Sequence, residues 1–155
     1  MTTIEKESEK LEGLNDRYLL FDINSTTYGL PLAMALEILT IQSITRLPCV
    51  APYIKGIVNL RGKVIPVLDV RAKLGIPRRD YDDKTCIIVV DIHDMHIGLI
   101  VDTVSEVVTV PSDRIIPPPS NSASYVSSVS ELENSVVLNL DFDTFFEADL
   151  ELTRT

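Results

Sequence analysis

The sequence is poor in the residues that most often carry chemistry. Its 155 residues include two histidines, two cysteines and no tryptophan. His93 and His96 are the only histidine pair, and without a third or fourth ligand nearby they do not predict a zinc site. Cys49 and Cys86 each lie beside aliphatic residues, so we expect buried, reduced thiols rather than a structural disulfide.

Several sequence patterns are also missing. There is no glycine-rich phosphate loop and no Gly-x-Ser-x-Gly pattern, so no nucleotide or cofactor site and no hydrolase nucleophile is predicted. No apolar run is long enough to span a membrane, and the N-terminus lacks the apolar region of a secretory signal. We therefore expect a cytoplasmic binding module. An enzyme on a β scaffold stays a competing hypothesis that rests only on scattered Asp and His residues.

Positive charge is scarce. The formal net charge is −9, which argues against nucleic acid as a partner. The charge is uneven, because the segment from Lys55 to Arg79 contains seven basic residues and Asp69 alone as an acid. This segment predicts a local basic face for a specific partner. Asp69, Asp91 and Asp102 are expected to be solvent-facing strand residues or turn caps.

Ile, Val and Leu are abundant, and they favour strands. Strands are expected at 17–23, 28–30, 38–44, 85–92, 95–101, 102–110 and 135–140. Short helices are expected at 31–38, 71–75 and 141–148, and a Pro- and Ser-rich connection at 111–130. The pattern predicts an all-β barrel or sandwich. The expected organisation is a charged tail over 1–16, one domain over 17–150 and a short tail over 151–155.

The stretch from Gly56 to Arg71 predicts a β-hairpin. Two apolar β-branched runs flank Asn59-Leu-Arg-Gly62, and Gly62 can adopt a positive φ at low cost. Arg61 should lie at or near the tip. Pro66 lacks a backbone donor and should lie at a strand edge or a bulge.

This hairpin and its surroundings resemble the CheW family, the coupling proteins of bacterial chemotaxis. The resemblance is carried by Tyr53-Ile-Lys-Gly-Ile-Val-Asn-Leu-Arg-Gly-Lys-Val-Ile-Pro-Val-Leu-Asp-Val-Arg71. Further segments agree in the family's order, and they are Tyr28-Gly-Leu30, Glu37-Ile38, Ile44-Thr45-x-x-Pro48, Thr85-Cys-Ile-Ile-Val-Val90 and Gly98-Leu-Ile-Val-Asp-Thr-Val104. The similarity runs from about Arg17 to about Ile116.

The resemblance implies two small SH3-like β-barrel subdomains that share an aliphatic core, with a groove between them. It also implies an adaptor without enzymatic activity. Such an adaptor joins methyl-accepting chemotaxis receptors to the regulatory domain of the histidine kinase CheA, in receptor arrays at the inner face of the membrane. The receptor-facing positions fall on Glu37, Gly56, Arg61, Cys86 and Val107. Leu39 and Ile41 are the candidates for kinase contacts, and ordinary core burial is the alternative for Leu39, Ile41, Cys86 and Val107.

Three positions depart from the family pattern. Tyr125-Val-Ser-Ser128 stands where the family usually has Tyr-Ile/Val-x-Gly, Asn139 replaces an aliphatic residue in the last strand, and Cys86 replaces another. These departures predict altered packing in the last subdomain. Two other readings stay open, namely a CheV-like adaptor and a CheW-like scaffold of a non-chemotactic receptor–kinase pathway. The CheV-like reading requires a phosphate-receiving domain, for which we expect no room after Ile116.

Overall fold

The computed structural model describes residues 16–120, 123 and 125–146. The predicted tails over 1–16 and 151–155 lie outside the described residues, apart from Asp16, as does the end of the helix expected at 141–148. No helix within the described ranges is long and apolar enough to cross a bilayer. The strands are β1 (Arg17–Ile23), β2 (Thr26–Pro31), β3 (Ala35–Thr40), β4 (Ile54–Leu60), β5 (Lys63–Asp69), β6 (Cys86–Ile92), β7 (Met95–Val101), β8 (Thr103–Thr109), β9 (Ile115–Ile116), β10 (Val126–Glu131) and β11 (Val136–Leu140). The helices are α2 (Val70–Lys73), α3 (Phe142–Phe145) and the 3-10 turns η1 (Leu32–Met34) and η2 (Ser112–Arg114).

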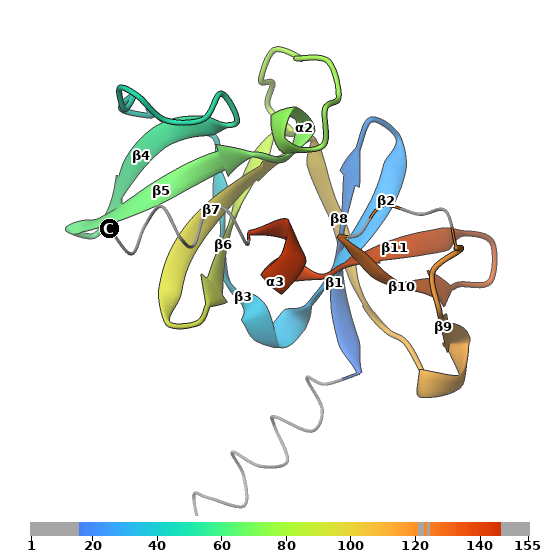
Figure 1. Ribbon diagram of the computed structural model, residues 1–155. Helices are drawn as coiled ribbons and strands as arrows, with labels where there is room; N and C mark the ends of the chain where they lie inside the picture. Colours follow the sequence, from blue (N-terminus) through green and yellow to red (C-terminus); the bar gives the residue numbers. More distant parts are fainter. Residues whose placement is uncertain (1–15, 121–122, 124, 147–155) are drawn as a thin grey trace, which may run out of the picture.

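The strands form two sheets (Figure 1). Sheet A has the order β8-β1-β2-β11-β10-β9, and sheet B has the order β3-β6-β7-β5-β4. The chain starts in sheet A, builds the whole of sheet B from β3 to β7, and returns to sheet A at β8. The fold is thus all-β, with two SH3-like subdomains and two short α-helices, which confirms the predicted fold class.

The two sheets share one aliphatic core, and the position of β6 within it explains why its residues 87–90 are all apolar. Its Ile88 and Val90 belong to a cluster that also contains buried residues of sheet A, such as Phe21. Its Ile87 and Val89 point the other way, into a second cluster inside sheet B. Because successive side chains of a strand face opposite ways, a strand buried on both faces has no polar alternation.

The predicted hairpin is present as β4, a two-residue turn and β5. Leu60 pairs with Lys63, so Arg61 and Gly62 are the central turn residues, with φ of 54° and 83°. Positive φ at both positions is typical of the type I′ turn, whose twist matches that of the flanking strands. The Gly62 N–H donates to Asn59 Oδ1 at 2.9 Å, which further fixes the turn. Arg61 therefore lies at the tip, as predicted.

Pro66 does not lie on an edge strand, because β5 runs between β7 and β4. Its strand partner Ile57 uses both backbone groups on Thr45, with N–H···O distances of 2.8 and 2.9 Å. Ile57 and Pro66 are therefore a pair without mutual hydrogen bonds, and the Pro66 nitrogen faces the side of β7. Pairing with β7 begins only at Val67. The prediction that Pro66 lies at a strand edge was therefore wrong. The missing N–H of Pro66 nevertheless costs no hydrogen bond between strands, because neither neighbouring strand offers it a hydrogen-bond partner there.

Two further sequence expectations are corrected. The helix expected at 31–38 is only the 3-10 turn η1, and β3 begins at Ala35. Half-buried and exposed side chains alternate along β3, so pairing with β6 overrides the helix preference of Ala, Leu and Glu. The expected connection at 111–130 contains β9 and the start of β10. Serine is compatible with β10 because the valines at 126 and 129 are buried.

The departures at the C-terminal end compensate one another. Asn139 is buried on β11, and its Nδ2 donates to Ser128 Oγ at 3.1 Å and to Ser130 Oγ at 2.8 Å. Its Oδ1 has no hydrogen-bond partner and would lie 2.7 Å from a Cβ added at Gly29. The serines of β10 and the glycine of β2 therefore accommodate an amide where the family usually has an aliphatic residue.

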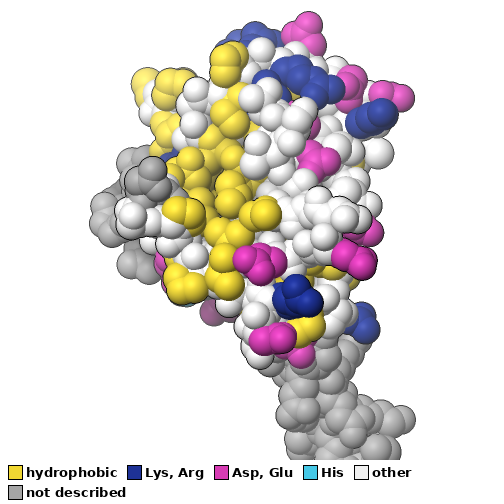
Figure 2. Space-filling view, turned by 90° about the vertical axis from the view of Figure 1, so that its right-hand side faces the viewer, with side chains coloured by type: hydrophobic (Ala, Val, Ile, Leu, Met, Phe, Trp, Pro, Cys, Tyr) yellow, Lys and Arg dark blue, Asp and Glu magenta, His cyan; other side chains and the backbone are white. Residues whose placement is uncertain are grey.

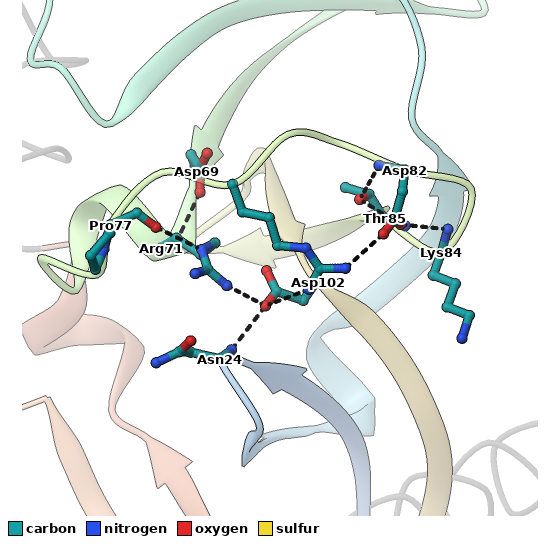
Figure 3. A network of polar contacts seen from close by, with 9 residues as sticks. Asn24, Asp69, Arg71, Pro77, Asp82, Lys84, Thr85 and Asp102 are labelled. Atoms are coloured by element: carbon teal, nitrogen blue, oxygen red, sulfur yellow. Dashed lines mark hydrogen bonds and ion pairs between the residues drawn. The ribbon is translucent and has the colours of Figure 1, made fainter.

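A buried polar cluster ties the two sheets together, as Figure 3 shows. Asp102, at the β7–β8 junction, accepts from Arg71 Nη1 at 2.5 Å and from the backbone N–H of Asn24 at 2.8 Å. Asn24 lies between β1 and β2, whereas Arg71 belongs to α2, which follows β5. Asp102 is therefore buried, whereas the sequence analysis expected a solvent-facing strand residue or a turn cap. Asp69 is also buried. It does cap a turn, as expected, since its Oδ1 accepts from the N–H of Arg71 at 3.0 Å.

Candidate partner-binding site

Two of the predicted receptor contacts, Glu37 and Arg61, meet in space. Arg61 Nη2 lies 2.6 Å from Glu37 Oε1, and Nη1 lies 3.0 Å from Oε2. Glu37 belongs to β3 and Arg61 to the β4–β5 turn, and β3 and β4 are the two outer strands of sheet B. A bidentate pair holds the planar guanidinium in one orientation, so the charge at the hairpin tip is fixed in direction.

The pair is open to solvent. The Arg61 side chain is 73% exposed and the Glu37 side chain 28%. The hydrogen bonds from Arg61 to Glu37, followed by the charge of that carboxylate, raise the pKa of Arg61 above its ordinary value. Arg61 is therefore a permanent cation. Two of its five N–H donors are used on Glu37, and the others can reach a partner.

Gly56 allows two segments of backbone to lie unusually close together. Its φ is +146°, and an added Cβ would lie 2.0 Å from the backbone oxygen of Thr45. Thr45 forms an isolated antiparallel bridge with Ile57, next to Gly56 in β4. Glycine thus allows the chain after β3 to lie against β4, which closes this side of sheet B. The predicted close approach of backbone is found within the chain itself.

Cys86 and Val107 lie on different sheets. Cys86 begins β6 opposite Thr40 of β3, is half-buried, and packs against the shared core. Val107 lies on β8, the outer strand of sheet A, and is 46% exposed. Both cysteines are free, but Cys49 is exposed, so the expectation of two buried thiols is wrong for Cys49.

The proposed kinase contacts Leu39 and Ile41 are half-buried and pack against the core inside sheet B. On β3 the outward apolar side chains are Leu36 and Ile38, which are 48% and 46% exposed. Sequence reasoning missed them as surface residues. The signal was available, because period-two alternation places Leu36 and Ile38 on the face opposite Glu37.

Figure 2 shows the side of the molecule that carries sheet A. Hydrophobic side chains form a continuous band there, and basic and acidic side chains gather around its upper end. Single exposed apolar residues are ordinary on protein surfaces, whereas a continuous band with a charged border is typical of surfaces that bind other proteins.

Three of the seven basic side chains of the expected basic face, Arg61, Arg71 and Arg79, pair with carboxylates. Arg71 is buried against Asp102, and Arg79 Nη2 lies 2.6 Å from Asp82 Oδ2. Lys63 Nζ lies 2.7 Å from His96 Nδ1. The Arg61 side chain, 73% exposed, is the most exposed of these three arginines. Among the arginines paired with carboxylates, the one at the hairpin tip is therefore the most accessible to a partner.

Within the described residues, no group of three or more His, Cys, Asp or Glu side chains could hold a metal ion. The two histidines have separate neighbours. His93 Nε2 lies 2.6 Å from Asp143 Oδ1, and His96 lies beside Lys63. What the arrangement offers is therefore an oriented, solvent-exposed charge pair, with exposed aliphatic side chains on the opposite face of β3, and such surfaces are suited to binding other proteins.

Known proteins are similar to this chain in sequence and in fold. Residues 17–149 match the family model described as the CheW-like domain. The Chemotaxis protein CheW of Bacillus subtilis (strain 168) is 37% identical over 100 residues, which cover 64% of each chain. The Chemotaxis protein CheW of Klebsiella aerogenes is 26% identical over 142 residues, covering 89% of this chain and 86% of that protein. The crystal structure of the scaffolding protein TtCheW from Thermoanaerobacter tengcongensis matches with a TM-score of 0.81 at 32% identity, covering 86% of this chain and 93% of that chain.

The family match covers most of the chain, and the solved relative is similar along nearly its whole length. The sequence resemblance and the two-sheet fold therefore lead to the same family by separate routes. The chain belongs to the CheW family.

Proposed function

We propose that this protein is a non-enzymatic adaptor that couples chemoreceptor signalling tips to the histidine kinase CheA. The observation that carries the proposal is the CheW-like match over residues 17–149. Relatives bear the name chemotaxis protein CheW, and the solved relative is titled a scaffolding protein. The adaptor is expected in the cytoplasm, recruited to receptor arrays.

The receptor side of the proposal rests on the Glu37–Arg61 pair. Both side chains reach solvent, and their bidentate contact fixes them before a partner binds. A prearranged cation loses little side-chain entropy on binding, so it can add to affinity and to orientation. A helical hairpin with a carboxylate or free carbonyl groups at its surface would complement Arg61. Exposed Val107 and half-buried Cys86 are the proposed apolar contacts.

The kinase side rests on β3. The related barrel of the kinase regulatory domain would pack against the end of sheet B, where Leu39 and Ile41 are half-buried. Leu36 and Ile38 on the opposite, outward face of β3 add exposed aliphatic surface to the same strand. A contact built from aliphatic side chains is typical of the core of a stable protein interface.

The test is direct binding to both partners from the same organism, the kinase regulatory domain and a receptor signalling-tip fragment. The proposal expects each partner to bind alone and all three proteins to form one complex in sedimentation. Absence of binding to both would overturn the adaptor function. Binding to the kinase of a different receptor pathway, with none to the chemotaxis kinase, would favour a CheW-like scaffold of a non-chemotactic pathway.

A second arm separates the two surfaces. Val107→Asp places a charge on exposed β8, where the native side chain contributes little to the core. It should weaken receptor binding more than kinase binding. Equal loss of both, together with a lower unfolding midpoint, would mean that Val107 supports the fold rather than the receptor contact.

A further inference from the structure

A loop passes over the buried polar cluster that joins the two sheets. Residues 77–84, which we call the strap, lie between α2 and β6, and Figure 3 shows this stretch arching over Arg71 and Asp102. The strap is exposed except for half-buried Asp82, whereas the side chains of Arg71 and Asp102 are only 11% and 10% exposed. The strap thus lies between this ion pair and the solvent.

The first half of the strap contacts both members of the ion pair. Arg71 Nε donates to the backbone oxygen of Pro77 at 3.0 Å, so the strap holds the guanidinium together with Asp102. Arg79 Nη1 lies 3.4 Å from Asp102 Oδ2, which brings a second cation to the same carboxylate. The strap therefore supplies an acceptor to the buried cation and a positive charge to the buried anion.

Tyr81 fastens the middle of the strap. Its hydroxyl donates to Asp69 Oδ2 at 2.8 Å, while Asp69 Oδ1 accepts from the backbone N–H of Arg71 at 3.0 Å. Burial, and then the hydrogen bond to Asp69, raise the pKa of Tyr81 above its ordinary value, so the hydroxyl keeps its proton near neutral pH. Asp69 therefore connects the strap to the start of α2, which carries Arg71.

A small cavity shows how closely the strap covers the cluster. Its volume is about 10 Å³, and its lining includes Arg79, Asp80 and Tyr81 of the strap together with Arg71 and Asp102. A space of this size admits no more than about one water molecule. The surroundings of the ion pair therefore have a low dielectric constant, and the attraction between the two charges is much stronger there than in water.

We propose that the strap is a latch on the junction between the two sheets, and that the Tyr81–Asp69 hydrogen bond keeps it closed. While the strap is closed, Asp102 is shielded from water and binds both Arg71, on the side of sheet B, and the Asn24 N–H in the β1–β2 turn of sheet A. When the strap lifts, water reaches Asp102, the ion pair weakens to the strength of an exposed pair, and the turn is released. The inference concerns one chain alone and does not depend on the proposed adaptor function.

The Asn24 N–H reports on this junction, and the Gly62 N–H provides a matched reference. Each amide belongs to a two-residue turn between paired strands and donates to a side-chain oxygen. The acceptor is Asp102 Oδ2 for Asn24 and Asn59 Oδ1 for Gly62. Gly62 precedes β5, whereas Asp69 ends this strand, so the reference amide lies at the end of β5 opposite to the latch.

The experiment measures amide hydrogen exchange in the full chain, residue by residue, by NMR. Tyr81→Phe removes only the hydroxyl that binds Asp69, and Arg79→Gln removes the second cation beside Asp102. Arg78→Gln is the matched control, because it makes the same change at the neighbouring exposed arginine. The proposal expects Tyr81→Phe to raise the exchange rate of the Asn24 amide about fivefold or more, the effect of losing one hydrogen bond.

Arg79→Gln should raise the Asn24 rate in the same direction, while Arg78→Gln and the Gly62 amide should stay near native. An Asn24 rate that remains native in both Tyr81→Phe and Arg79→Gln would overturn the proposal. An equal rise in the amides of β6 and β7 would also overturn it, because the variants would then lower the stability of the whole fold. A rise confined to the β1–β2 turn would support the latch.

Discussion

Arg61 donates hydrogen bonds to both carboxylate oxygens of Glu37, although the two residues belong to opposite sides of sheet B. Glu37 lies on β3 and Arg61 at the end of β4, so the pair spans the opening between the two outer strands. The bridge between Thr45 and Ile57 spans the same opening at another point. The proposed receptor contact is therefore built on the elements that close the barrel.

Gly56→Ala tests whether this closure depends on glycine. The new Cβ would lie 2.0 Å from the Thr45 carbonyl oxygen, and the backbone at φ +146° is strained for any other residue. We expect a loss of about 2–4 kcal/mol in the free energy of unfolding, from steric clash and backbone strain. Urea unfolding of the two proteins measures this difference.

Gly62→Ala is the control for the Gly56 variant. Gly62 also has a positive φ, +83°, but an added Cβ would have no heavy atom within 4 Å. Its cost should be only the backbone preference, about 1 kcal/mol. Equal effects at the two glycines would show that the close approach of Thr45 contributes nothing beyond φ.

Asp102→Ala should be strongly destabilising. It leaves the buried Arg71 guanidinium without its carboxylate and removes the acceptor for the Asn24 N–H, which connects the β1–β2 turn to the β7–β8 junction. Breaking a buried ion pair from one side costs about 3–5 kcal/mol. Chemical denaturation followed by circular dichroism measures the change.

Asp82→Ala provides the comparison for Asp102. Asp82 also pairs with an arginine, since its Oδ2 lies 2.6 Å from Arg79 Nη2, but this pair is solvent-exposed. Its removal also takes away the acceptor for the N–H groups of Lys84 and Thr85 in the same loop, but the effect should be smaller than at Asp102, because water replaces an exposed ion-pair partner at little cost. If both variants lost the same stability, Asp102 would not be the polar link between the sheets.

The environment of Tyr81 leads us to expect that the folded state loses stability in alkaline solution. Burial, and then the hydrogen bond to Asp69 Oδ2 at 2.8 Å, raise the pKa of Tyr81 above its ordinary value. A raised pKa in the folded state means that the stabilising contribution is complete below the unfolded pKa of about 10 and declines as pH rises above it. Unfolding midpoints should therefore fall more steeply above about pH 10 in the native protein than in Tyr81→Phe. Parallel pH profiles for the two proteins would contradict this role of Tyr81.

Local sequence rules predicted the hairpin well. A turn was predicted over Asn59–Gly62 between two β-branched runs, and the structure narrows it to Arg61 and Gly62, because a turn is a local property of the chain. The start of the helix expected at 141–148 was predicted for the same reason, and Asp141 caps it, since its Oδ1 accepts from the N–H groups of Asp143 and Thr144. The boundary at Ala35 was missed because β6 decides it, and β6 lies some fifty residues away along the chain.

In the candidate site, too, the sequence predicted individual residues but not the contacts between residues that lie far apart along the chain. Resemblance selected Glu37 and Arg61 as separate contacts, but only the fold shows that they bind one another across 24 positions of sequence. The burial of Arg71 and Asp102 was likewise invisible, because their partners come from different segments. Asn139 was noted as a departure, whereas its compensation by Ser128 and Ser130 required the pairing of β10 with β11.

The most direct test of the adaptor account is the affinity of Arg61→Glu for the receptor signalling-tip fragment and for the kinase regulatory domain, measured by titration calorimetry. The substitution reverses the charge at an exposed turn and places a second carboxylate beside Glu37. Because the Arg61 side chain is 73% exposed, solvent screens this repulsion and the unfolding midpoint should stay close to native. Arg78→Glu, the same change at another exposed arginine, is the control. The account predicts that Arg61→Glu weakens receptor binding about tenfold or more, while kinase binding and the control stay near native. Native receptor affinity in a folded Arg61→Glu protein would contradict it.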